Sequence, residues 1–223
     1  MSVSESPAAA SISSPDAKFG REQRTAPQRN RAASRARLLA SGRALFAERG
    51  LHGVTSHDIA ARAGVSAGTF YNHFQDKAAL CREIAREGLA ELERRLEQAE
   101  PGDLDLRQRV PLVARALVGF AVDHRDLIQI LFSGDAEAVA VEADVLADLA
   151  RRLSEGRRQA VAEGAMPREL DPDVLAQAVV GMWARVLAWW AQDPDRASTD
   201  SLIETLTRIQ LSGTHPRRDS EDA

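Results

Sequence analysis

Residues 55–77 read TSHDIAARAGVSAGTFYNHFQDK, and this stretch decides the fold. Two short helical segments are predicted in it, at residues 56–63 and 67–74, with Gly64 in the turn between them. Glycine suits that turn because it takes a positive φ without the steric penalty of a Cβ atom. Two helices of this length around a short glycine-containing turn are typical of a helix-turn-helix.

Each predicted helix here follows a residue that can cap it. Thr55 offers a hydroxyl to the first helix, and Asp58 three residues later completes an approximate capping box. Ser66 stands before the second helix, and Asp76 before a longer helix that follows. Such caps occur in any helical protein, so they locate helix starts and do not by themselves indicate a function.

The apolar and polar residues of this stretch separate onto two faces. Four apolar side chains are expected to form a wedge beneath the turn: Ile59, Val65, Phe70 and Phe74. The outward residues of the second helix are small, polar or aromatic: Ala67, Gly68, Thr69, Tyr71, Asn72 and His73. Because a recognition helix points its N-terminal part at base edges, Thr69 is placed to contact a base.

Other residues of the stretch are candidates for phosphate contacts. Tyr71 and His73 are shaped to reach the DNA backbone, although Tyr71 fits a half-buried packing position and His73 an ordinary surface position equally well. Lys77 combines an ammonium group with the free amides of a helix N-terminus, which attract anions. Thr55 and Ser56 stand at another such N-terminus.

Charge is distributed unevenly along the chain. Residues 1–77 carry 11 Lys and Arg against 6 Asp and Glu, whereas residues 78–223 carry 18 against 27. A basic head on an acidic body suits a protein whose head alone meets a polyanion. Four arginines precede or begin the first predicted helix and are expected to add non-specific attraction: Arg29, Arg31, Arg35 and Arg37.

The rest of the chain is predicted to be helical between two polar tails. Residues 1–28 are rich in Ser, Pro and Ala and are expected to be disordered, as is the tail at residues 213–223. Helices are predicted at residues 31–49, 76–97, 104–124, 125–132, 135–164, 172–192 and 198–211. Pro111 predicts a kink in the helix at residues 104–124, or a start nearer Arg109.

The head stretch resembles the TetR family of bacterial repressors. The resemblance rests on these segments: ALFAERG at 44–50, VT at 54–55, DIA at 58–60, AGVSAGTFYNHF at 63–74 and DKAAL at 76–80. It implies an all-α homodimer with a three-helix DNA-binding head and a helical-bundle body for effector binding and dimerisation. The DNA contacts that it implies are Thr55, Ser56, Ser66, Gly68, Thr69, Tyr71, Asn72, His73 and Lys77.

Three domain boundaries follow from this interpretation. The DNA-binding head is expected at residues 29–77 and the body at residues 78–212. The last two helices of each subunit are expected to form the dimer interface, with Trp190 on the interface side of an apolar stripe. A two-fold pair of heads demands an inverted-repeat operator in double-stranded DNA.

A ligand pocket is expected between the body helices, for a mostly apolar small molecule. Its candidate lining residues are Phe120, His124, Ile128, Phe132, Met182 and Trp183. The same residues suit an ordinary core, so the sequence identifies no ligand. The function indicated is a repressor released from its operator by an effector, or alternatively a regulator that needs no effector.

Several other classes of protein lack support in the sequence. We find no HExxH, GxSxG or Gly-rich phosphate loop, and the five histidines are scattered, so neither an enzyme nor a metal or cofactor site is expected. Cys81 is the only cysteine and is interpreted as a core residue. No apolar run approaches the roughly 20 residues of a membrane span and no secretory signal is evident, so a cytoplasmic location is expected.

Overall fold

The computed structural model describes residues 26–99, 104–162 and 170–212. These residues contain helices and no strand, so the predicted all-α fold class is confirmed for this part of the chain. The predicted tails at 1–25 and 213–223 lie outside the described residues. The helices are α1 (Ala26–Arg49), α2 (Ser56–Arg62), α3 (Ala67–Tyr71), α4 (Lys77–Ala99), α5 (Leu106–Asp123), α6 (Arg125–Leu131), α7 (Ala136–Ala162), α8 (Pro172–Gln192), the short 3₁₀ helix η1 (Pro194–Arg196) and α9 (Thr199–Ser212).

Three predicted helix boundaries need correction. Helix α1 begins at Ala26, so residues 26–28 are helical and do not belong to a disordered tail. Helix α3 ends at Tyr71, which places His73 in a turn. Helix α5 begins at Leu106, where Asp105 accepts a hydrogen bond from the Gln108 amide (2.8 Å), so a start near Arg109 is wrong.

The predicted caps of the head helices are present. The Thr55 hydroxyl accepts from the Asp58 amide (3.1 Å), and Asp58 Oδ2 accepts from the Thr55 amide (2.9 Å), which completes the capping box. Gly64 has a φ of +63°, the left-handed conformation that the turn requires. The caps and this glycine fix the angle between α2 and α3 from residues close in sequence.

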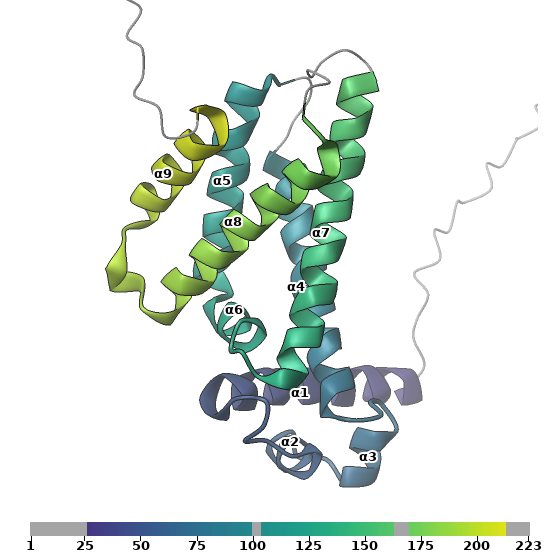
Figure 1. The fold of residues 1–223 in the computed structure, drawn as a ribbon. Coiled ribbons are helices and arrows are strands. Elements are labelled where there is room, and N and C mark those ends of the chain that lie inside the picture. Colours follow the sequence, from purple (N-terminus) through teal and green to yellow (C-terminus); the bar gives the residue numbers. More distant parts are fainter. Residues whose placement is uncertain (1–25, 100–103, 163–169, 213–223) are drawn as a thin grey trace, which may run out of the picture.

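The head and the body occupy opposite ends of the molecule (Figure 1). Helix α1 lies across the base of the body, with α2 and α3 beyond it. Helix α4 leaves the head and runs the length of the body, where α5 and α7 pack against it and α8 packs on α7. Helix α9 packs on α5 at the side away from α7. The C-terminal end of α4, the N-terminal end of α5 and the C-terminal end of α7 therefore lie together, far from the head.

The core of the head continues into the body. A single apolar cluster runs from Leu38 of α1 and Phe70 of α3 to Leu80 of α4 and Leu131 of α6. Ile59, Phe70 and Phe74 are buried in it and Val65 packs against it, so the predicted wedge is confirmed. The head and the body therefore share one continuous apolar core.

A second cluster joins α5, α8 and α9, and it corrects the role of Trp190. That side chain is only 4% exposed within one subunit, and its Nε1 donates to the Ala197 carbonyl (3.0 Å). Trp190 is thus a core residue of the subunit and is unsuited to an interface. Its neighbour Trp189 is 43% exposed.

Helix α8 is also the one helix in the described ranges that is long and apolar enough to cross a membrane by length and composition alone. One such helix is weak evidence, because a core helix of a soluble protein passes the same test. Here α8 supplies Trp183, Leu187 and Trp190 to the second cluster.

Candidate DNA interface and ligand cavity

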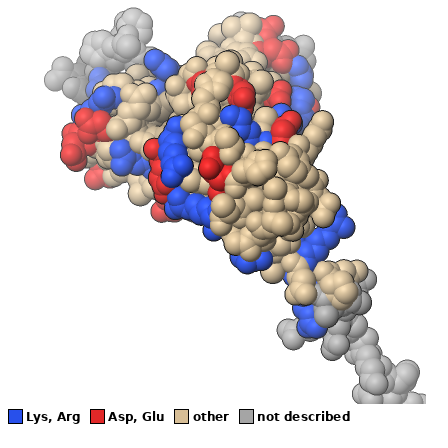
Figure 2. Space-filling model, turned by 90° about the horizontal axis from the view of Figure 1, so that it is seen from below, with Lys and Arg blue, Asp and Glu red and all other residues tan. Residues whose placement is uncertain are grey.

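Helix α3 presents an uncharged polar face. Ser66 caps it by accepting from the Thr69 amide (3.1 Å), and the Ser66 and Thr69 hydroxyls lie 2.9 Å apart. Tyr71 is 53% exposed, which excludes the half-buried packing role within the subunit. Figure 2, turned by 90° from the view of Figure 1 so that the molecule is seen from below, shows an area without charged side chains beside groups of Lys and Arg.

A shallow hollow separates the start of α1 from the end of α3. It is lined by Asn30, Arg31, Ser34, Thr69, Asn72 and His73. His73 Nε2 lies 2.8 Å from the Ser34 hydroxyl, and burial, together with the charges of Arg31 and Arg35, lowers the pKa of His73. Asn30 and Ser34 were missed as site candidates, because only the packing of α1 in the folded head shows that they line the same hollow as Thr69 and His73.

The Lys77 ammonium does not point outward as a phosphate anchor would. Its Nζ donates to the Leu51 carbonyl (2.8 Å) and lies 3.5 Å from Glu137 Oε2 of α7. The ammonium therefore connects the head to the body. The α4 backbone amides at this position remain candidates for an anion contact.

The four arginines near the start of α1 also differ from one another. Arg35 bonds Glu83 and Glu87 of α4 and stacks over Phe74, so it holds α1 against α4. Arg29, Arg31 and Arg37 are exposed. Only these three remain candidates for non-specific attraction to DNA.

An ion pair joins α1 to α6 where the head meets the body. Arg43 donates two hydrogen bonds to Asp126, from Nε to Oδ2 (2.5 Å) and from Nη2 to Oδ1 (2.6 Å). Burial opposes ionisation of Asp126, but the hydrogen bonds and charge of Arg43 together with the Leu127 amide outweigh it, and the pKa of that carboxyl is lowered. Arg43 Nη2 also lies 3.1 Å from His124 Nδ1, and burial followed by the Arg43 charge lowers the pKa of His124.

The body contains a cavity of about 430 Å³, within the roughly 300–1,000 Å³ typical of small-molecule sites. Helices α4 to α8 line it, with Gln210 from α9. Of the six residues predicted to line a pocket, the structure brings four together here: Phe120, Ile128, Phe132 and Trp183. His124 and Met182 do not line it, because His124 stacks on Phe120 at the α1–α6 junction and Met182 packs against the second cluster.

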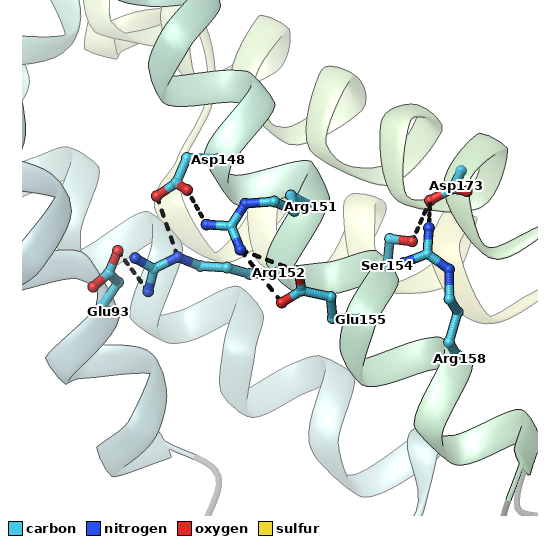
Figure 3. A network of polar contacts seen from close by, with 8 residues as sticks. All are labelled: Glu93, Asp148, Arg151, Arg152, Ser154, Glu155, Arg158 and Asp173. Carbon is cyan, nitrogen blue, oxygen red and sulfur yellow. Dashed lines mark hydrogen bonds and ion pairs between the residues drawn. The ribbon is translucent and has the colours of Figure 1, made fainter.

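Most of the cavity wall is apolar, but five polar side chains contribute to it: Glu93, Arg109, Arg152, Arg157 and Gln210. None of the five was singled out as a pocket residue from the sequence. Arg152 pairs with Glu93 of α4 (2.9 Å) and with Asp148 (3.2 Å), in a network that continues along α7 (Figure 3). Trp183 Nε1 donates to Gln210 Oε1 (3.0 Å), which orients that amide.

Groups that suit metal or thiol chemistry are few. Over the described ranges, no cluster of three or more His, Cys, Asp or Glu side chains is placed to hold a metal ion. Cys81 is 1% exposed, and burial raises the pKa of its thiol to about 11, as expected for a core residue.

Comparison with known proteins agrees with this geometry. The family model described as bacterial regulatory proteins, tetR family, matches residues 38–84. The repressor DhaR of Mycobacterium sp. (strain GP1) is 26% identical over 81% of this chain and 93% of its own length. The repressor KstR2 of Mycolicibacterium smegmatis is 28% identical over 82% of this chain and 91% of its own.

A solved structure shares the whole architecture. The transcriptional regulator FadR of Bacillus subtilis, crystallised in complex with stearoyl-CoA, superposes with a TM-score of 0.69 at 18% identity, over 81% of this chain and 99% of its own. The helix-turn-helix head on an all-α body defines a DNA-binding transcriptional regulator. The head of this chain, at residues 38–84, is thus similar to that of the TetR family of bacterial regulators.

Proposed function

We propose that this protein is a repressor that binds an inverted-repeat operator as a homodimer and is released by a small effector in the body cavity. The observation that carries the proposal is that one chain combines an exposed polar α3 face with a mostly apolar cavity in the body. The names of DhaR and KstR2 support repression, and the ligand of FadR supports an effector with a long apolar part.

Operator reading is assigned to α3 and to the two helix N-termini beside it. Thr69 is proposed to contact a base from the N-terminal half of α3, and Gly68 leaves room for the DNA, because a Cβ there would meet only Ser66 Oγ at 3.8 Å. Phosphate contacts are assigned to Tyr71, Asn72 and His73 and to the amides near Thr55, Ser56, Ser66 and Lys77.

Dimerisation is assigned to α8 and α9. Three large apolar side chains of these helices are exposed on a single subunit: Val174, Trp189 and Ile209. Exposed apolar area of this kind, on the helices farthest along the chain from the head, suits an interface between two copies. A dimer is also needed for affinity, because one short recognition helix reads only a few base pairs.

Coupling between cavity and head is assigned to α4 and α6. Leu127 and Ile128 of α6 line the cavity, and Asp126 beside them holds Arg43 of α1. Gly88 of α4 approaches Leu127 so closely that a Cβ would lie 2.2 Å from its Cδ2. An effector that displaces α6 would therefore move α1 and change the angle of the head, which lowers DNA affinity.

A regulator without an effector is the alternative, and the cavity argues against it. A mostly apolar pocket of this size is typical of a small-molecule site, and a regulator without an effector would have no use for it. Enzymatic activity is not proposed, because the relatives are transcriptional regulators. A soluble bacterial regulator works on DNA in the cytoplasm, which is the proposed location.

Selection of bound DNA from a random pool tests the operator proposal. The full chain should enrich an inverted repeat, and Trp189→Asp should abolish that enrichment while the protein sediments as a folded monomer. Trp190→Asp is the contrasting variant, since it places a charge in the subunit core and should unfold the body. Enrichment of a single half-site, or a persistent Trp189→Asp dimer, would contradict the proposed interface.

A further inference from the structure

One arginine of the cavity wall stands apart from the other arginines around it. Arg157 of α7 is only 8% exposed, its Nε is fully buried, and among the described residues nothing accepts a hydrogen bond from its side chain. Burial lowers the pKa of its guanidinium, yet an arginine stays charged in proteins. A buried cation therefore faces the cavity without a counter-charge from the part of the chain that the structure describes.

Neighbouring arginines of α7 are all compensated (Figure 3). Arg151 bonds Asp148 and Glu155, Arg152 pairs with Glu93 and Asp148, and Arg158 lies 2.5 Å from Asp173. The contrast matters because an unpaired buried charge is strongly unfavourable, whereas a paired one is tolerated. Each exposed arginine of this stretch therefore has an acidic partner, whereas the buried Arg157 has none among the described residues.

The position of Arg157 in the cavity wall indicates which kind of ligand would pair with its charge. It belongs to the C-terminal part of α7, which lies at the end of the body far from the head (Figure 1). The rest of the wall is mainly aliphatic and aromatic, from Leu89 and Leu92 on α4 to Leu127 and Leu131 on α6. Gln210 accepts from Trp183 through Oε1, which leaves its amide nitrogen as a second donor in the wall.

We infer that Arg157 is the residue that selects the effector: a molecule with one anionic group, a carboxylate or a phosphate, joined to an apolar chain. This inference rests on the proposed function, because it takes the cavity as the effector site. The guanidinium fork matches both anions with two parallel hydrogen bonds. The apolar chain then extends from Arg157 toward α6, where it reaches the residues that hold the head.

Binding of three ten-carbon probes to the full chain tests the inference: decanoic acid, decyl phosphate and 1-decanol. Calorimetry reports binding, and so does tryptophan fluorescence, because Trp183 lies in the cavity wall. We expect at least one of the two anions to bind about tenfold or more tighter than 1-decanol, the factor for a hydrogen bond between charged groups. Which anion binds tighter distinguishes the carboxylate from the phosphate.

Substitution of Arg157 provides a second test of the inference. Arg157→Gln should bring the affinity for the anions down to that for 1-decanol and leave 1-decanol affinity unchanged. Arg158→Gln removes the same charge one residue away, from an exposed arginine outside the cavity wall, and should keep the preference. Arg157→Gln should also melt at the same or a higher temperature without ligand, since it removes an unpaired buried charge.

The outcomes separate this inference from the proposed function. Equal affinity for all three probes, or a preference that survives Arg157→Gln, would overturn anion selection and leave an apolar effector site standing. Failure of every probe to bind would overturn both the ligand class and the cavity as its site. Anion-selective binding that leaves the affinity for operator DNA unchanged would uphold the inference and contradict effector control.

Discussion

The DNA-facing head and the ligand cavity are built from the chain in opposite ways. Every contact proposed for operator reading lies within residues 55–77, where two caps and one glycine turn orient neighbouring helices. The cavity draws its wall from six helices between Ala85 and Gln210. A local site is specified by spacing and cap chemistry, whereas a site assembled from distant segments depends on how the whole body packs.

The two regions nevertheless form one mechanical unit. The cluster that contains Phe70 of the head also contains Leu127 and Leu131 of the cavity wall. Arg43 and Lys77 add polar links across the same junction. We therefore expect the head to respond to changes in the body, and the following predictions test that from the largest expected effect to the smallest.

Phe70→Ala should have the largest effect, a loss of about 3–5 kcal/mol in the free energy of unfolding, because Phe70 is fully buried in the shared cluster. All three tryptophans lie in α8, so their fluorescence reports the body alone while circular dichroism reports every helix. Both signals should shift together in the variant. A tryptophan transition that stays at its original denaturant concentration would show that the head unfolds independently.

Arg43→Ala should weaken communication between the regions. It removes both hydrogen bonds to Asp126, so a cavity ligand should change DNA affinity less, by up to about 1–3 kcal/mol of coupling free energy. Arg62→Ala is the matched control, because Arg62 pairs with Glu48 inside the head (2.7 Å). The measurement compares the DNA affinity of each variant with and without ligand. If the ligand changes DNA affinity in Arg43→Ala as much as in the unchanged protein, Arg43 does not connect the cavity to the head.

Thr69→Ala should relax sequence preference by about 1 kcal/mol, the scale of one base pair read incorrectly. The measurement compares affinity for the selected operator with affinity for random DNA. Thr69→Ser keeps the hydroxyl and should retain more of the preference than Thr69→Ala does. Equal losses on both kinds of DNA would argue against a base contact.

Salt dependence should distinguish Arg31 from Lys77. Arg31→Ala should reduce the slope of log affinity against log salt by about one unit, as for the loss of one phosphate contact. Lys77→Ala should leave that slope unchanged and lower stability, because the Lys77 ammonium is engaged with Leu51 and Glu137. A reduced slope for Lys77→Ala would restore the phosphate role expected from the sequence.

A decrease in pH should have the smallest effect, a modest loss in the free energy of unfolding. Burial and Arg43 lower the pKa of His124 from 6.5, so the unfolded chain binds a proton there before the folded protein does. The free energy of unfolding should consequently fall as the pH decreases below about 6.5. His124→Asn should flatten this dependence, and an identical pH profile in the variant would remove His124 as its source.

Much of the head could be predicted from the sequence. The capping box at Thr55 and the positive φ of Gly64 follow from short-range chemistry, and both are present. Lys77 was harder, because its partner carbonyl at Leu51 and its partner carboxylate at Glu137 are distant in sequence. Spacing within a motif defines where a helix starts and does not define which way a long side chain turns.

The body was less predictable for the same reason. Trp189 and Trp190 both fit the apolar stripe of α8, and only the packing of η1 and α9 against that helix shows which of them is buried. His124 was expected in the cavity but lies beside Arg43 of the head. Arg157 could not be singled out from the sequence, because Arg151, Arg152 and Arg158 surround it and the four together are typical of a solvated helix face.

The most direct test of the central claim is a single measurement of reciprocity. The affinity of the full chain for its selected operator is measured with and without a saturating cavity ligand, and ligand affinity with and without operator. We predict that both affinities fall by the same factor, about 5-fold to 150-fold, as two linked sites require. Unchanged DNA affinity with the cavity filled would contradict the claim that the body controls the head.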